Sequence, residues 1–564
     1  MKMLLTAVNA KYIHSNPAVY SLRAYAAEYG EHIEIAEYTI NNKMEAILAD
    51  LFMRKPEVIA FSCYIWNWDM IQELLTELPK ILPRTDIWLG GPEVSYDAEK
   101  ILLQYPQLTG IMIGEGEETF LELMRYYCDS VPAALESIKG LCLPEKGFTG
   151  ERELTDIDRI PFFYEEGFGG METFSNRIIY YESSRGCPFR CSYCLSSIDK
   201  KVRLRRLDQV KRELQFFIDR KVPQVKFVDR TFNCNHEHAL GIWNYLKEHD
   251  NGVTNFHFEV SADILNEEEL KVLSQMRPGL VQLEIGVQST NPETIREIRR
   301  TMNLDRLRSI VEQIHAGKNI HIHLDLIAGL PYEDYDTFVR SFDEVYEMEP
   351  EQLQLGFLKV LKGSYMHEKT GDYGIYYRSN PPYEVLYSKW LSYEEVLRLK
   401  RVEEMVELYY NSGQFRHTLK VLEGAFESPF HLYEKLAEYY EEKGYFINSP
   451  ARSYRYEVLF DFAISADAAR AELYRELLTY DMYLREKCKS RPSFAKDLLP
   501  YKEEIRSRQQ DKKDHMDVFF YPVWEKEPEQ IGKRSDEPMY VRFCYEWRNP
   551  LNHNAEIEIS KGVI

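Results

Sequence analysis

The chain has 564 residues, of which 44% are hydrophobic and 29% are charged, and its formal net charge is −21. This length exceeds what one hydrophobic core supports, so we expect a soluble protein of roughly three to four domains. The acidic balance disfavours a nucleic-acid substrate, because nucleic-acid binders neutralise phosphates with basic patches. The sequence has no apolar run of about 18 residues and no signal-peptide core at its start, so we expect a cytoplasmic protein without membrane spans.

Short apolar segments alternate with helical patterns over residues 1–130. The predicted strands are residues 3–9, 33–39, 58–64, 86–92 and 110–116. Such alternation predicts a doubly wound, Rossmann-like parallel sheet, in which ligands bind beyond the carboxyl ends of the strands. Glycines and polar residues follow several of these strands, which suits the close approach of a bulky ligand. Plain βα turns are the alternative explanation for any single glycine among them.

A second series of strands begins after a stretch rich in glycine and proline. The six predicted strands are residues 178–186, 225–232, 255–262, 280–289, 320–329 and 352–360. Six βα units predict a partial (β/α)6 barrel with its active face at the C-terminal ends of the strands. The remaining chain predicts a mainly helical α+β region with late strands at 515–521 and 539–547. The predicted domains are therefore 1–145, 177–365 and 366–564, with a linker at 146–176.

Three of the nine cysteines, Cys187, Cys191 and Cys194, lie within eight residues, directly after the first strand of the predicted barrel. Their Cys-x3-Cys-x2-Cys spacing places three thiolates on one tight loop. This arrangement suits a [4Fe–4S] cluster whose fourth iron stays open for a substrate or cofactor. A zinc site is the alternative, with Cys234 or a histidine as its fourth ligand. The other six cysteines are scattered, which disfavours a disulfide framework.

With Tyr193 before its last cysteine, this motif resembles the signature of the radical S-adenosylmethionine (SAM) superfamily, and the resemblance spans residues 177–365. In that family the open iron binds SAM, and the reduced cluster cleaves it to methionine and a 5′-deoxyadenosyl radical. The family often has a Gly-Gly-Glu segment at the second strand, from which this sequence departs. The resemblance implies SAM contacts at Tyr193, Asp229, Glu259, Ser261, Glu284 and Gln288. Hydrogen bonds inside the barrel are the alternative role for the strand residues.

The N-terminal region resembles the cobalamin-binding class of radical SAM enzymes. Residues 90–93 (Gly-Gly-Pro-Glu) and 114–117 (Gly-Glu-Gly-Glu) match segments of that class, and residues 9–14 and the C-terminal region resemble one uncharacterised subgroup of it. The resemblance implies cobalamin contacts at Asn9, Tyr12, Ser62, Tyr64, Gly90, Gly91, Glu93, Gly114 and Gly116. The Asp-x-His-x-x-Gly signature of other cobalamin proteins is absent. For His14, in the first βα loop, we therefore expect a structural or cofactor-edge role rather than cobalt ligation.

These resemblances predict a cobalamin-dependent radical SAM enzyme that transfers a methyl group to an unactivated carbon. A radical rearrangement or ring formation is the alternative within enzymes. Sulfur insertion into tRNA would need a second cluster, for which the N-terminal region has no three-cysteine set. A cobalamin or redox sensor without turnover is the alternative from a different class. We expect a small-molecule or peptide substrate and an electron donor such as flavodoxin or ferredoxin.

Overall fold

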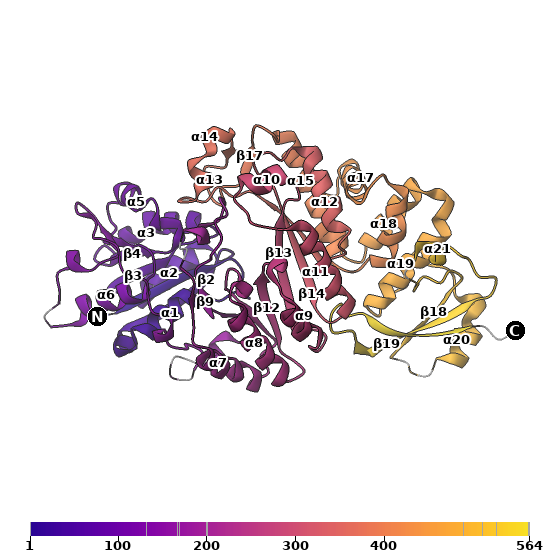
Figure 1. Ribbon diagram of the computed structural model, residues 1–564, viewed down its shortest axis with the longest axis horizontal. Coiled ribbons are helices and arrows are strands. Elements are labelled where there is room, and N and C mark those ends of the chain that lie inside the picture. Colours follow the sequence, from indigo (N-terminus) through magenta and orange to yellow (C-terminus); the bar gives the residue numbers. More distant parts are fainter. Residues whose placement is uncertain are drawn as a thin grey trace. The chain divides into compact units, whose positions relative to one another are not determined.

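The structure is a computed structural model that describes residues 2–130, 132–165, 167, 170–198, 201–488, 490–509, 511, 513–525 and 527–561 (Figure 1). The chain divides into two compact units. The first unit comprises residues 1–281, 295–303 and 357–389, and the second comprises residues 282–294, 304–356 and 390–564. Within the described residues, none of the helices is long and apolar enough to cross a membrane.

The first unit begins with a seven-stranded sheet in the order β2-β1-β3-β4-β5-β6-β7. Its parallel strands are β1 (Met3–Asn9), β2 (Ile33–Thr39), β3 (Val58–Ser62), β4 (Asp86–Gly90) and β5 (Gly110–Met112). Helices α1 (Pro17–Tyr25), α2 (Met44–Arg54), α3 (Trp68–Ile81), α5 (Ala98–Gln104) and α6 (Glu117–Cys128) separate them. Every residue of β1 is buried, as expected for a central strand covered on both faces. The predicted doubly wound sheet is confirmed.

Two further strands extend this sheet and were not predicted. They are β6 (Leu141–Leu143) and β7 (Gly147–Phe148), which pair antiparallel after β5. Glu145 in the turn between them and Gly147 at the start of β7 both have positive φ (62° and 75°). This hairpin spans residues 141–148 and so crosses the predicted boundary between the first domain and the linker.

The six strands of the predicted barrel are all present. In the first unit, β8 (Ile179–Tyr181), β11 (Gln224–Phe227) and β12 (Asn255–Val260) lie side by side and parallel, and are separated in the chain by α7 (Leu207–Asp219) and α8 (His236–Glu248). In the second unit, β13 (Val281–Gln288) pairs parallel with β14 (His321–Ala328) and β15 (Gln352–Phe357) is next in order, with α11 (Leu304–Gly317) and α12 (Tyr335–Tyr346) between them. Burial alternates strictly along β13, so residues 282, 284, 286 and 288 share its less buried face.

The second unit ends in helices and a small sheet. Its main helices are α15 (Tyr393–Met405), α16 (Arg416–Leu422), α17 (Pro429–Glu442), α18 (Arg455–Ala466) and α19 (Ala471–Arg485). Three antiparallel strands follow, β18 (His515–Phe519), β19 (Met539–Arg548) and β20 (Ala555–Lys561), drawn in yellow in Figure 1. The mainly helical α+β character is confirmed, and β20 is an additional strand.

Candidate active site

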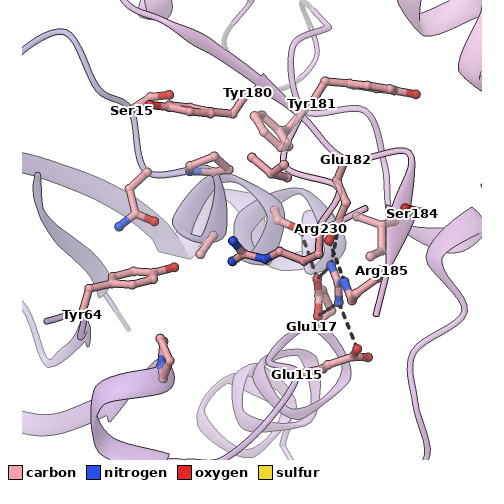
Figure 2. A pocket seen from close by; sticks show the side chains of 18 of the residues that line it. Ser15, Tyr64, Glu115, Glu117, Tyr180, Tyr181, Glu182, Ser184, Arg185 and Arg230 are labelled. Carbon is pink, nitrogen blue, oxygen red and sulfur yellow. Dashed lines mark hydrogen bonds and ion pairs between the residues drawn. The ribbon is translucent and has the colours of Figure 1, made fainter. Parts of the chain in front are cut away.

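A cavity of about 840 Å³ lies in the first unit, at the carboxyl ends of the N-terminal strands (Figure 2). From the N-terminal sheet its walls include Asn9, Tyr64, Trp66, Glu115 and Glu117. From the strands that follow they include Tyr180, Tyr181, Glu182, Gly186, Val228 and Arg230. Its volume is that of a pocket for a large cofactor or substrate. Gly186 directly precedes Cys187, the first of the clustered cysteines. The same cavity therefore borders both the predicted cobalamin region and the cysteine loop.

Of the nine predicted cobalamin contacts, Asn9 and Tyr64 line this cavity. The ring of Tyr64 stacks on that of Trp66 with their centroids 4.3 Å apart. The Ser62 hydroxyl accepts a hydrogen bond from the Asn16 amide (3.2 Å), and Asn16 is itself part of the wall. These residues form an amphipathic surface at the ends of β1 and β3, and their position agrees with the predicted role.

The predicted glycines differ in their surroundings. Gly91 has φ 112°, and a Cβ there would lie 2.5 Å from the carbonyl oxygen of Cys63. The backbone of Gly91 therefore passes so close to Cys63 that only glycine fits. Gly114 has φ 79° and open space around the position of a Cβ, whereas a side chain at Gly90 would meet Met112 and one at Gly116 would meet Leu22. Close packing therefore explains Gly90, Gly91 and Gly116, whereas Gly114 faces open space.

Two further predicted contacts lie away from the cavity wall. The side chain of Tyr12 is 66% exposed, with the Arg177 guanidinium over its ring. Glu93 is buried, and its carboxylate accepts hydrogen bonds from Lys362 Nζ (2.9 Å) and from the Tyr383 hydroxyl. Glu93 thus holds a segment that follows the barrel strands, and its predicted contact with cobalamin stays a prediction.

His14 lies in the cavity wall, where its Nδ1 is 2.6 Å from the hydroxyl of Tyr180. Burial lowers the pKa of this imidazole, as do the nearby charges of Lys11 and Lys226. The lowered pKa favours the neutral ring, and the hydrogen bond with Tyr180 orients it, while the structural or cofactor-edge role of His14 stays a prediction.

The three cysteines of the loop differ in their burial. Cys187 and Cys191 are buried, and Cys194 is partly buried. The Arg300 guanidinium is 3.9 Å from the sulfur of Cys191. Burial raises the pKa of Cys191, although the positive charge of Arg300 opposes that shift. Arg300 also interacts with the Tyr193 side chain, which is partly buried. Three free thiols on one loop, with a cation beside one of them, fit the ligand set of an iron–sulfur cluster.

Asp229 is buried behind the cavity wall, between the wall residues Val228 and Arg230. Its carboxylate accepts hydrogen bonds from the Ser183 backbone N–H (2.9 Å) and from the hydroxyls of Ser183 and Ser184 (both 2.6 Å). Burial raises the pKa of Asp229 to about 6, although the serine hydrogen bonds oppose that shift. In this conformation Asp229 supports the segment that leads into the cysteine loop. Its contact with SAM stays a prediction.

The two candidates at the end of β12 are held differently. The Ser261 N–H donates to the Asn233 side chain (2.9 Å), which donates back to the Ser261 carbonyl (2.8 Å). The Ser261 hydroxyl donates to Asp263 (2.8 Å), while Glu259 is half-buried on β12. Ser261 is therefore fixed by its neighbours, and the SAM contacts of both residues stay predictions.

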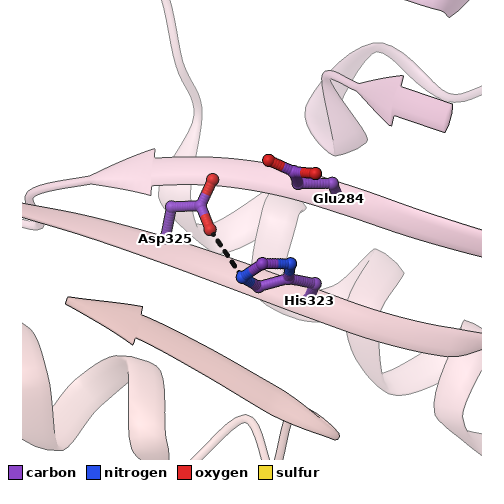
Figure 3. A group of neighbouring side chains, drawn as sticks. All are labelled: Glu284, His323 and Asp325. Carbon is purple, nitrogen blue, oxygen red and sulfur yellow. Dashed lines mark ion pairs between the residues drawn. The ribbon is translucent and has the colours of Figure 1, made fainter. Parts of the chain in front are cut away.

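In the second unit, Glu284 lies beside two groups that the sequence reasoning missed (Figure 3). Glu284 pairs in register with His323, and Asp325 follows on the same face of β14. The ligand atoms of the three side chains lie within 4.8 Å of one another, and His323 Nε2 is 3.0 Å from Asp325 Oδ1. Spacing of two along a strand could have indicated His323 and Asp325. Such carboxylates can accept hydrogen bonds from the hydroxyls of a ribose, and the contact of Glu284 with SAM stays a prediction.

Gln288 ends β13 with φ 74°, a conformation that is uncommon outside glycine. The next residue, Ser289, donates a hydrogen bond to the buried carboxyl of Glu333 (2.7 Å), which also accepts one from Ser341 (3.0 Å). Burial raises the pKa of Glu333 to about 7. Glu333 therefore fixes the strand end that presents Gln288, and no local pattern in the sequence indicated this role.

Three family models match the chain. The radical SAM superfamily matches residues 181–345, the B12 binding domain matches residues 3–124, and DUF4080, a family of proteins of unknown function, matches residues 371–553. The radical SAM and B12-binding domains imply a [4Fe–4S] cluster, SAM and cobalamin as cofactors. The free cysteines of the loop and the large cavity beside it fit these groups.

Curated relatives match about half of the chain at low identity. The chain is 24% identical, over 57% of its length, to the cobalamin-dependent radical SAM methyltransferase TokK of Streptomyces tokunonensis, of which it matches 50%. It is also 24% identical, over 55% of its length, to the hopanoid C-3 methylase of Methylococcus capsulatus, of which it matches 60%. The chain thus spans about half the length of these curated relatives.

Solved structures share its fold. The cobalamin-dependent SAM radical enzyme OxsB with aqua-cobalamin bound has a TM-score of 0.57 at 14% identity, with 85% of this chain and 79% of that chain covered. The methyltransferase TsrM from Kitasatospora setae, with cobalamin and a [4Fe–4S] cluster bound, has a TM-score of 0.54 at 16% identity, with 68% and 78% covered. The three family models identify the chain as a radical SAM protein with an N-terminal B12-binding domain and a C-terminal DUF4080 domain.

Proposed function

We propose that this protein is a cobalamin-dependent radical SAM methyltransferase acting on an unactivated carbon. One observation carries the proposal: the cysteine loop begins in the wall of the same cavity that the strand ends of the B12-binding domain line. When bound, the cluster supplies the electron that cleaves SAM, and cobalamin supplies the methyl group. The names of TokK and the hopanoid methylase support methyl transfer, while a related magnesium-protoporphyrin ester cyclase supports ring formation as the second candidate.

We assign the ligands as follows. Cys187, Cys191 and Cys194 hold the cluster. SAM is bound by Tyr193, Asp229, Glu259, Ser261, Glu284 and Gln288. Cobalamin is bound by Asn9, Tyr12, Ser62, Tyr64, Gly90, Gly91, Glu93, Gly114 and Gly116, and the cavity supports this most directly for Asn9 and Tyr64. Tyr64, Trp66, Tyr180 and Tyr181 give the cavity an aromatic wall, which suits the water-poor environment that a carbon radical requires.

The reaction needs partners that the chain does not contain. Radical SAM enzymes generally require a reductant, and we propose flavodoxin or ferredoxin for this one. We propose a small molecule or peptide as substrate and a cytoplasmic location.

Methyl transfer is tested with methyl-deuterated SAM. Anaerobically reconstituted protein, given cobalamin, SAM and dithionite, should add a deuterated methyl group to a component of a cell extract. The control is the Cys191→Ala variant, in which no labelled product should form. A wild-type protein that cleaves SAM but rearranges or cyclises a component without mass gain from the label would favour the second candidate.

Cobalt coordination gives a separate prediction. The first βα loop lacks Asp-x-His-x-x-Gly, and the His14 ring is hydrogen-bonded to Tyr180, so we expect cobalamin to bind with its own base displaced and without a histidine as lower ligand. A neutral imidazole is a good cobalt ligand, so its absence should be visible in the electron paramagnetic resonance spectrum of the Co(II) form. We expect a spectrum without three-line splitting from an axial nitrogen. A splitting that is present in the wild type and lost in His14→Ala would make His14 the ligand.

A further inference from the structure

The cysteine loop is closed at its base by two short strands. β9 (Ser184–Arg185) and β10 (Arg203–Leu204) pair antiparallel, with Arg185 directly opposite Arg203. All three cluster cysteines lie in the chain between these strands. Like charges that face each other across a strand pair are destabilising, so the two arginines need compensation.

Two glutamates that follow β5 in the B12-binding domain, Glu115 and Glu117, compensate the charges of these arginines (Figure 2). Glu117 accepts two hydrogen bonds from Arg185 (2.9 and 3.3 Å). Glu115 accepts from Arg203 (3.0 Å) and lies 3.6 Å from Arg185, so its carboxylate is shared by the two facing guanidiniums. Glu182 provides a second pair of bonds to Arg185 (2.9 and 2.8 Å). Each arginine at the base of the loop is thus held by a glutamate from the other domain.

These contacts are shielded from solvent. The side chain of Glu117 is 7% exposed and that of Arg203 is 11% exposed. Burial raises the pKa of Glu115, but the hydrogen bond from Arg203 and the charge of Arg185 bring it below its usual range. Glu115 also accepts from the Thr155 N–H (2.8 Å). Charge-assisted hydrogen bonds that are bidentate and partly shielded from water are among the strongest hydrogen bonds in proteins.

The backbone is tightly packed at the base of the cysteine loop. Gly186 joins Arg185 to Cys187 with φ 97°, and a Cβ there would lie 2.5 Å from the carbonyl oxygen of Lys201. The two ends of the loop therefore touch immediately beyond the arginines. A displacement of Arg185 would be transmitted to the first cluster cysteine.

We propose that Glu115 and Glu117 are positioning residues that clamp the base of the cysteine loop onto the B12-binding domain. Their carboxylates hold Arg203 and Arg185, and so set the place of the cluster relative to the cavity where cobalamin and SAM react. This inference rests on the proposed function. It gives the glutamates of the Gly-Glu-Gly-Glu segment a role that is separate from contact with the corrin.

The test compares Glu117→Gln, Arg185→Gln and the double variant with the wild type, each reconstituted with its cluster. We expect unchanged iron content and unchanged SAM affinity in Glu117→Gln, with about a tenfold lower rate constant for 5′-deoxyadenosine formation, as expected for loss of a charge-assisted contact. The double variant should be no slower than Arg185→Gln, because the two residues act as one pair. The matched control is Glu118→Gln, since the neighbouring Glu118 interacts with Tyr25 and Arg159 instead.

The reduction midpoint of the cluster gives a readout that a merely structural role would not produce. Removing the negative charge in Glu117→Gln should raise the midpoint, and removing the positive charge in Arg185→Gln should lower it. Loss of iron from Glu117→Gln, or a rate and midpoint equal to those of Glu118→Gln, would overturn the proposal. A wild type without iron or without SAM cleavage would instead overturn the proposed function, so the two failures are distinguishable.

Discussion

Replacement of Cys191 by alanine is expected to remove most of the iron and to abolish SAM cleavage. The wild type, reconstituted anaerobically, should hold about four iron and four sulfide per chain. Loss of one thiolate leaves an iron without its ligand. The Arg300 guanidinium beside Cys191 would also lose the anion that it faces. Iron and sulfide analysis together with visible absorption measures the effect.

Cys234 is the matched control for this experiment. It is half-buried and lies in the segment after β11, outside the loop that carries the three cluster cysteines. Cys234→Ala should therefore keep the cluster. Full iron content in a variant that lacks Cys187, Cys191 and Cys194 would contradict the cluster assignment. A tightly bound zinc ion that is lost in Cys234→Ala would support the zinc alternative.

Replacement of Asp229 by alanine is expected to weaken SAM binding without loss of iron. The carboxylate accepts three hydrogen bonds from Ser183 and Ser184, and without it the buried Ser183 N–H would have no acceptor. Leaving such a donor unsatisfied is costly, so the segment before the cysteine loop should shift. We expect SAM affinity to fall about tenfold, measured by equilibrium binding to the reconstituted protein.

Asp229→Asn separates charge from shape at this position. The amide oxygen can still accept from the Ser183 N–H, so the asparagine variant should bind SAM better than the alanine variant. An unchanged SAM affinity in Asp229→Ala would remove Asp229 from the SAM site and would leave the cluster assignment intact.

The sequence was sufficient to predict the fold where long segments have a clear pattern of apolar residues. Continuous apolar strands predicted the parallel N-terminal sheet, and the spacing of three cysteines predicted the loop that begins in the cavity wall. The strands β6, β7 and β10 have two or three residues each, too few to show alternation, and β9 was predicted as the end of one strand over residues 178–186. The pairing of these strands depends on tertiary contacts, so no local pattern could indicate it.

Partners distant in the chain account for most of what the sequence reasoning missed. Glu93 looked like a residue beyond a strand end, but its carboxylate meets Tyr383, 290 positions later. Arg300 reaches Cys191 across 109 positions, and Arg185 reaches Glu117 across 68. A motif shows which residue types are present at a strand end. Whether such a side chain faces the cavity or a neighbouring segment depends on contacts that no single stretch of sequence contains.

Release of 5′-deoxyadenosine tests the assignment of this chain as a radical SAM enzyme most directly. The wild-type protein, anaerobically reconstituted and given SAM and dithionite without substrate, should form 5′-deoxyadenosine slowly, as measured by liquid chromatography. The variant without Cys187, Cys191 and Cys194 should form none. A wild type that holds its full cluster and binds SAM, yet releases no 5′-deoxyadenosine, would contradict the proposed enzyme and would favour a sensor without turnover.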